Sequence, residues 1–258
     1  MRPSKEEALT TGSGRLSSET SDGVTTITFS HPKSNSLPGK MLAGLAESVR
    51  AAGTNPKTTV IVLRSEGTGA FCAGASFSEL RAIHNATEGK KFFMGFATLI
   101  IAMIRCPKLI VTRVQGKTVG GGVGIIGASD YVLATEAAAI RLSELAIGLG
   151  PFIVGPAIER KIGMGAYSAM TIDADWRDAR WAERHGLYAE VHPDIAALDE
   201  SLASRVATLT ASNPQAMAHL KSVFWEGTEN WDALLESRAE MSGTLVLSEY
   251  TRKAIGRA

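Results

Sequence analysis

The sequence VGGGVG at positions 119–124 follows a run rich in β-branched residues and leads into a stretch of helical character. An earlier sequence, AFCAGA at positions 70–75, has the same setting. Such turns leave backbone N–H groups unpaired, and two of them facing each other would form a pocket for an oxyanion. Packing or simple turn geometry also explains a single glycine turn. The pair favours a ligand site, because ligands of α/β sheets bind at the carboxyl ends of strands.

One acid, Glu144, lies shortly after the second turn in a largely apolar stretch, residues 137–150. Arg141 is the only other charged residue of this stretch, so a surface acid paired with Arg141 is one interpretation. The other is a carboxylate in an apolar pocket, where burial raises the pKa and makes the group a better base. Combined with the two turns, the second interpretation predicts chemistry on the enolate of a thioester.

Strand-like and helix-like patterns alternate over the first part of the chain and become helical beyond Pro156. This alternation predicts an α/β core followed by a C-terminal helical region. The main strands are expected at residues 23–29, 58–63, 109–114, 131–135 and 140–142. The expected division is a flexible arm at 1–20, the core at 21–195 and the helical region at 196–258.

Composition narrows the classes of ligand and partner. The chain has 258 residues, and 27 Lys and Arg against 26 Asp and Glu give a net charge of +1, which provides no general attraction to nucleic acid. Two cysteines are too few for a disulfide framework, and the five histidines lack metal-ligand spacing, so no metal site is expected. The N-terminus has no apolar signal segment, and the longest mainly apolar stretch, residues 92–104, is too short to span a membrane. We therefore expect a cytoplasmic protein without a membrane partner.

Other catalytic motifs are absent from the sequence. Neither glycine turn ends in the Gly-Lys-Ser/Thr of a phosphate-binding loop, and G-x-G-x-x-G is missing at the first strand. None of the serines lies in G-x-S-x-G, so a hydrolase nucleophile is not supported.

At these residues the sequence resembles the crotonase superfamily, also called the enoyl-CoA hydratase/isomerase family. The two glycine-bearing turns are similar to the family's, and Asp130 matches a common family acid. The segment AERHGLYAEV at positions 182–191 is similar to the family element A-x-x-x-G-L-V-x-x-V. The resemblance covers roughly residues 23–258 and is weakest over the last 30 or so.

The resemblance implies a core of repeated β-β-α units and a C-terminal helical region that drives assembly into a homotrimer or a dimer of trimers. It also implies that the N–H groups of Ala75 and Gly121 form the oxyanion hole for an acyl-CoA thioester, which is the substrate and needs no further cofactor. Lys221 becomes a candidate contact for coenzyme A. The full set of expected substrate contacts is Ala73, Gly74, Gly122, Phe152 and Lys221.

Departures from the family pattern bear on the reaction. Family hydratases carry a glutamate two residues after the glycine triplet, where this chain has Gly124, while their second glutamate matches Glu144. Hydration uses two carboxylates to hold and activate one water, whereas moving a double bond needs one base that takes a proton from C2 and returns it at C4. Ser76 replaces the usual Asp after the first turn, and the loop at 148–152 is bulkier than the family's glycine-rich version.

Three functions are compatible with this pattern. An enoyl-CoA isomerase with Glu144 as acid and base is favoured. A hydratase that recruits a replacement acid, such as Glu79 or Glu159, is the first alternative. A non-catalytic acyl-CoA binder is the second, because one fold hosts many activities.

Overall fold

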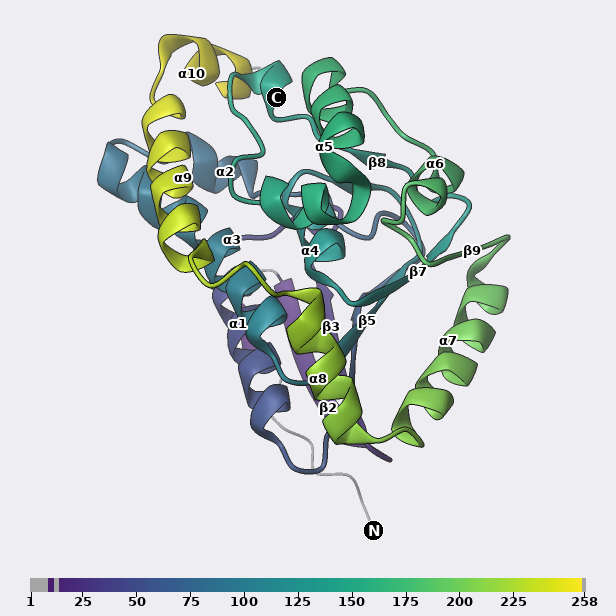
Figure 1. Cartoon of the computed structure of the whole chain (residues 1–258). Helices are drawn as coiled ribbons and strands as arrows, with labels where there is room; N and C mark the ends of the chain where they lie inside the picture. Colours follow the sequence, from purple (N-terminus) through teal and green to yellow (C-terminus); the bar gives the residue numbers. More distant parts are fainter. Residues whose placement is uncertain (1–8, 12–13, 257–258) are drawn as a thin grey trace.

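The computed structural model describes residues 9–11 and 14–256 and is built around a seven-stranded sheet (Figure 1). The first three strands of the sheet pair antiparallel, and the others are parallel to β3. In spatial order the strands are β1 (Leu9–Thr11), β2 (Gly14–Ser21), β3 (Val24–Ser30), β4 (Val60–Ser65), β5 (Leu109–Val114), β7 (Tyr131–Thr135) and β9 (Glu190–His192). A separate parallel pair, β6 (Thr118–Val119) and β8 (Ile140–Arg141), lies next to the second glycine turn.

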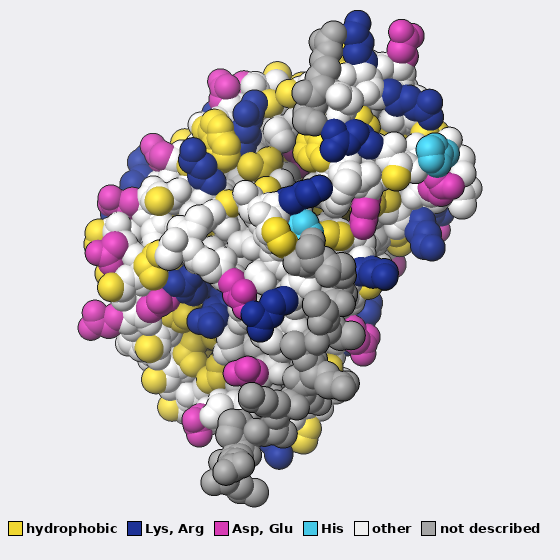
Figure 2. Space-filling model, turned by 180° about the vertical axis from the view of Figure 1, so that it is seen from behind, with side chains coloured by type: hydrophobic (Ala, Val, Ile, Leu, Met, Phe, Trp, Pro, Cys, Tyr) yellow, Lys and Arg dark blue, Asp and Glu magenta, His cyan; other side chains and the backbone are white. Residues whose placement is uncertain are grey.

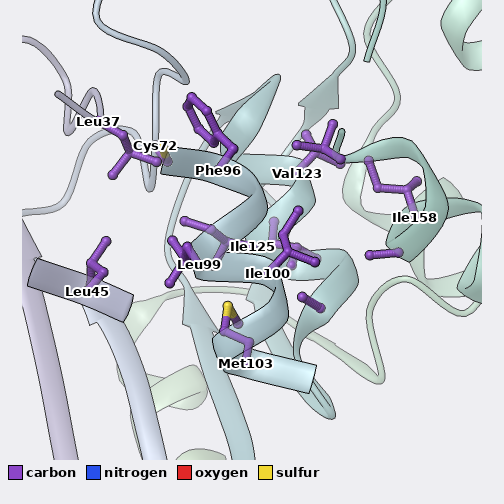
Figure 3. Close-up of a cluster of buried hydrophobic side chains, with 14 of the residues drawn as sticks. Leu37, Leu45, Cys72, Phe96, Leu99, Ile100, Met103, Val123, Ile125 and Ile158 are labelled. Carbon is purple, nitrogen blue, oxygen red and sulfur yellow. The ribbon is translucent and has the colours of Figure 1, made fainter. Parts of the chain in front are cut away.

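Helices cover both faces of the sheet. On one face, α1 (Gly39–Thr54) and α3 (Ala86–Arg105) pack against each other and build the main core. Figure 3 shows Phe96, Leu99, Ile100 and Met103 of α3 directed into this core. On the opposite face, α7 (Ile195–Thr210) covers the strands through Leu198, which packs with Val60, Val111 and Leu133 (Figure 1).

Five shorter or kinked elements come after β4, β6 or β8 in the chain. They are α2 (Phe77–Arg81), α4 (Gly121–Ala128), the 3₁₀ turn η1 (Leu145–Ile147), α5 (Gly155–Asp173) and α6 (Ala179–Arg184). Ser76 caps α2 by accepting a hydrogen bond from the Glu79 N–H. Helix α5 is kinked at Gly163, whose φ of 77° is a conformation that glycine adopts readily.

The chain ends in α8 (Pro214–Phe224), α9 (Trp231–Leu245) and α10 (Glu249–Gly256). Helix α9 packs along α3, as Figure 1 shows, and α10 contacts both α2 and η1. The last helix therefore reaches the same end of the molecule as the two glycine turns.

The α/β fold expected from the sequence is confirmed, and two local expectations are wrong. Residues 14–20, assigned to a flexible arm, belong to β2, and residues 9–11 form β1; residues 1–8 and 12–13 of the expected arm lie outside the described residues. Strand β2 is rich in Ser, Thr and Glu, and it was missed because its backbone pairs with β3 at every position from Arg15 to Ser21 without needing an apolar pattern. The region beyond Pro156 is not wholly helical, since β9 joins the sheet beside β7.

Helix hydrophobicity and surface charge bear on the partners of the protein. No helix in the described part of the chain is long and apolar enough to cross a membrane. On the face in Figure 2, basic and acidic side chains are interspersed. This distribution agrees with the net charge of +1.

Candidate active site

The two glycine turns lie directly against each other. The N–H of Val119, in the second turn, donates to the carbonyl of Cys72, in the first, at 2.9 Å. Gly74 has a φ of +83°, and a Cβ atom there would lie 2.9 Å from the Val119 carbonyl oxygen and 3.8 Å from the Gly121 nitrogen. Both the backbone conformation and this close approach therefore require glycine at position 74.

Two backbone N–H groups at this junction are available to a ligand. Gly121 is the first residue of α4, where N–H groups have no partner within the helix. Among the residues that the structure describes, the N–H groups of Ala75 and Gly121 donate to no other protein group. Both residues line the same cavity. The arrangement is suited to holding an oxyanion between two backbone donors.

The cavity beside these donors is predominantly apolar. It contains about 610 Å³ of space not filled by atoms, part of which is open to solvent. Its walls come from the two turns, α2, α3 and the loop after η1. The apolar side chains that line it include Phe77, Leu80, Phe93, Phe96, Ile147, Leu149, Phe152, Ile153 and Val154.

Among the described residues that line this cavity, Glu144 is the one with an acidic side chain. Its Oε1 would lie 3.0 Å from a Cβ atom at Gly120, which places the carboxylate next to the second glycine turn. The residue as a whole is partly exposed, but its Oε2 is buried and has no hydrogen-bond partner in the part of the chain described. Burial raises the pKa of Glu144 to about 7, against smaller opposing effects of backbone hydrogen bonds at Glu144 and Ser143. A carboxyl group with this pKa is suited to accepting and returning a proton near neutral pH.

The turn that carries Glu144 is internally closed. The N–H groups of Ile147 and Leu149 donate to the Glu144 carbonyl at 3.1 and 2.9 Å. Gly148 ends η1 in the left-handed region, with a φ of 79°. The backbone on the C-terminal side of Glu144 is therefore fixed over five residues.

The position of the missing second acid is occupied by another side chain. A Cβ atom at Gly124 would lie 2.5 Å from Cγ1 and 2.6 Å from Cβ of Val154. Contacts this short do not occur between real side chains, so Val154 fills the space into which a residue at 124 would extend. The absence of a side chain at Gly124 is thus matched by a bulky residue in the loop that follows Glu144.

The two acids considered as replacements lie outside the cavity lining. Glu79 accepts a hydrogen bond from the Gly39 N–H through Oε2 at 2.8 Å. Glu159 is on α5 and is likewise absent from the lining. Neither side chain contributes to the cavity that Glu144 lines.

Lys221 and Gly122 were expected to contact the substrate, but neither lines the cavity, so these two expectations are corrected. Lys221 is only 2% exposed, and its Nζ pairs with Asp130 Oδ2 at 2.8 Å and donates to the Lys108 carbonyl at 2.9 Å. Lys221 therefore links α8 to the residues flanking β5 and β7, and its buried, paired ammonium group is not available to bind coenzyme A. Gly122 faces Cys72 and Thr118 at distances that leave no room for a Cβ atom, and it does not line the cavity.

The remaining expected residues are brought together. Ala73, Gly74, Ala75, Gly121, Glu144 and Phe152 all line the cavity. The sequence did not single out Phe93 and Phe96, although their spacing of three on a helix puts them on one face. Phe96 packs so closely against Gly121 that a Cβ atom there would collide with its ring. Phe96 therefore supports the backbone of the second donor.

In the residues that the structure describes, no group of three or more His, Cys, Asp or Glu side chains could hold a metal ion.

Comparisons with known proteins agree on one family. The family model described as enoyl-CoA hydratase/isomerase matches residues 19–254. The chain is 29% identical over 244 residues to a probable enoyl-CoA hydratase of Rhodobacter capsulatus, which covers 92% of this chain and 91% of that protein. It is 36% identical over 132 residues to a (7aS)-7a-methyl-1,5-dioxo-2,3,5,6,7,7a-hexahydro-1H-indene-carboxyl-CoA hydrolase of Rhodococcus jostii. That match covers 51% of each chain, so the similarity spans about half the length of this relative.

Solved structures show the same fold. The crystal structure of an enoyl-CoA hydratase from Bacillus halodurans superposes with a TM-score of 0.86 at 20% identity, over 94% of this chain and 99% of that one. An enoyl-CoA hydratase from Mycobacterium avium subsp. paratuberculosis K-10 gives a TM-score of 0.85 at 25% identity, over 96% and 99% of the two chains.

Proposed function

The chain belongs to the enoyl-CoA hydratase/isomerase family, and we propose that within it this protein is an isomerase that moves the double bond of an enoyl-CoA with Glu144 as its one base. The observation that carries the proposal is the pairing of Gly124 with Val154. Where a second carboxylate would be needed to activate water, the space is filled by a valine side chain.

The proposed reaction uses the groups of the cavity in sequence. The thioester oxygen accepts hydrogen bonds from the Ala75 and Gly121 N–H groups, which makes the protons at C2 more acidic. The Glu144 carboxylate removes one C2 proton from a 3-enoyl-CoA, and the electron pair delocalises over the thioester as a dienolate. The protonated Glu144 then returns the proton at C4, so that the double bond ends between C2 and C3. No water is consumed, and Glu144 regains its starting state.

The pKa of Glu144 supports its use in both directions. A base with an ordinary carboxyl pKa would give up its proton easily but would be weak at removing one from carbon. Burial raises the pKa to about 7, which brings both half-reactions close to balance near neutral pH.

Phe152 is the aromatic residue to which we assign contact with the substrate. Its side chain lines the cavity and lies against Gly150 so closely that a Cβ atom there would collide with the ring. We propose that Phe152, with Ala73 and Gly74 across the cavity, contacts the acyl group and the thioester.

A homotrimer or a dimer of trimers in the cytoplasm is proposed as the functional state. Exposed apolar side chains on α8, namely Leu220, Val223 and Phe224, support burial in an assembly. Light scattering coupled to gel filtration would give the mass of the assembly, and a monomer would contradict this proposal.

A paired assay tests the isomerase assignment. A 3-enoyl-CoA and a 2-enoyl-CoA are supplied separately to the purified protein, and the products are resolved by mass spectrometry, with free thiol measured in parallel. We expect conversion of the first substrate to the 2-enoyl product and no addition of water to the second. Hydration of the second substrate would favour a hydratase, free coenzyme A would favour a hydrolase, and binding without any turnover would favour an acyl-CoA binder.

A further inference from the structure

Helix α10 contacts two of the elements that line the proposed active site, α2 and η1. Near its start, Thr251 is fully buried and donates through Oγ1 to the Gly148 carbonyl at 3.1 Å. Near its end, the Ile255 carbonyl accepts a hydrogen bond from Arg81 of α2 at 3.4 Å. Helix α2 begins two residues after Ala75, one of the proposed oxyanion donors. Helix α10 thus bridges the turn that carries the base and the segment that follows the first donor (Figure 1).

The contact at Gly148 is close and specific. A Cβ atom at Gly148 would lie 2.6 Å from Thr251 Oγ1 and 2.5 Å from Tyr250 Cδ1, so the helix sits directly on this glycine. The Thr251 hydroxyl uses both of its hydrogen-bonding functions, because Ser248 Oγ donates to it at 3.0 Å. Gly148 is four residues from Glu144 and belongs to the turn closed on the Glu144 carbonyl.

We propose that Thr251 is a positioning residue, which fixes the turn carrying Glu144 through the Gly148 carbonyl and so sets the carboxylate relative to the two oxyanion turns. The proposal rests on the proposed role of Glu144 as the base. Proton transfer depends steeply on geometry, so a displacement of about 1 Å in the base can cost about a hundredfold in rate. Removal of the hydroxyl would also leave the Gly148 carbonyl without this partner, against a side chain that is fully buried.

The loop beyond Gly148 has a second support from the C-terminal region. Arg238 of α9 donates to the Phe152 carbonyl at 3.1 Å. Helices α9 and α10 therefore hold the loop on either side of Leu149 and Pro151, and both of these residues line the cavity. Thr251 acts on the part of the loop nearer to Glu144.

The test replaces Thr251 with valine, which is similar in volume but lacks the hydroxyl. Amide hydrogen exchange of residues 144–152, measured without substrate, should be about tenfold faster in Thr251→Val, because the turn opens more often. With a 3-enoyl-CoA, kcat should fall about tenfold to a hundredfold at a nearly unchanged KM. The acid limb of the pH profile should move below its wild-type position near pH 7, because water reaches the Glu144 carboxylate more easily.

Two variants control the experiment. Thr251→Ser keeps the hydroxyl and should restore both exchange and kcat. Thr208→Val makes the same change on α7, where an exposed threonine hydroxyl donates to the Ser204 carbonyl at 3.0 Å, and should alter neither. If Thr251→Val does not fold, Ser248→Ala removes the donor to Thr251 Oγ1 and should produce smaller changes in the same direction.

The outcomes separate this inference from the proposed function. Unchanged exchange at 144–152 in Thr251→Val overturns the positioning role, whatever the activity of the wild-type protein. Faster exchange with unchanged kcat and pH profile overturns it as well. If the wild-type protein does not isomerise a 3-enoyl-CoA, the proposed function fails, and the exchange experiment still decides whether Thr251 holds the turn.

Discussion

Glu144 and Glu190 are both partly buried, yet their surroundings are opposite. The Glu190 carboxylate, in β9, interacts with four side chains at 2.5 to 3.0 Å, namely Tyr131, His192, Ser201 and Arg205. The Oε2 of Glu144 is buried and has none among the described residues. Burial alone would raise the pKa of each, but the side-chain hydrogen bonds at Glu190 reverse the effect and lower its pKa to about 2, whereas that of Glu144 rises to about 7.

The difference separates a carboxylate that stabilises the fold from the one that we propose as the base. A satisfied carboxylate stays ionised and ties together the elements that donate to it, here β7, β9 and α7. An unsatisfied one destabilises the ionised folded state and is retained where its basicity is useful. The comparison yields four tests, from the largest effect to the smallest.

Replacement of Glu144 by glutamine should remove the base while preserving the shape of the cavity. We expect kcat for a 3-enoyl-CoA to fall by about a thousandfold or more, since general acid–base groups contribute roughly 10² to 10⁴. Glu190→Gln should retain activity within about twofold. Steady-state kinetics of the two variants, with calorimetric binding of a saturated acyl-CoA to confirm an intact cavity, would check this. Comparable losses in both variants would contradict the division of roles.

The pH dependence of kcat/KM should report Glu144 alone. Glu144 must be ionised to remove the C2 proton, so activity should fall about tenfold per pH unit below a midpoint near pH 7. Glu190 is ionised throughout this range, since its pKa is about 2. The acid limb should therefore be identical in the wild-type protein and Glu190→Gln. A midpoint near 4.5 would mean that the Glu144 carboxylate is well solvated.

Stability should depend on Glu190 at neutral pH. Its folded-state pKa lies below the ordinary value of 4.5, so the ionised group stabilises the fold above pH 4.5, and this contribution is lost as the pH falls toward 2. The free energy of unfolding of Glu190→Gln should be about 2 kcal/mol lower than that of the wild type at pH 7. Urea unfolding at pH 7 and pH 3 should show the difference shrinking at the lower pH.

The opposite sign is expected at Glu144. Its folded-state pKa lies above 4.5, so the protonated group favours the fold at low pH, and this advantage is lost as the pH rises through 7. Glu144→Gln should raise the free energy of unfolding by about 1 kcal/mol at pH 8 and leave it unchanged below pH 4.5. The same urea series would measure it, and a destabilised variant at pH 8 would show that the carboxylate has a partner.

The sequence was sufficient for the fold class, and its local patterns also singled out Glu144, whose role as the base stays a prediction. The apolar stretch around Glu144 indicated burial, and the paired turns indicated where an anion would bind. Contacts between distant segments carry no such local signal. Lys221 was expected at the ligand, since nothing in α8 shows that its partner is Asp130, 91 residues earlier.

The same limit applies to the cavity. Val154 is unremarkable in the sequence, and only the packing of α4 on α5 brings it against Gly124. Likewise, β2 is recognised by its pairing with β3 and not by its composition. The sequence predicted the turns and the acid that line the cavity more fully than it predicted the side chains that shape the space around them.

The valine beside Gly124 also has a consequence for where a transferred hydrogen comes from. With that space filled, the cavity lining that the structure describes provides no second carboxylate to hold a water that could exchange with the Glu144 proton. The hydrogen removed from C2 should then be the one delivered to C4. A 3-enoyl-CoA deuterated at C2 and converted in ordinary water should yield a 2-enoyl product that keeps much of its label at C4. The position of the deuterium in the product would then record the path of the transferred hydrogen.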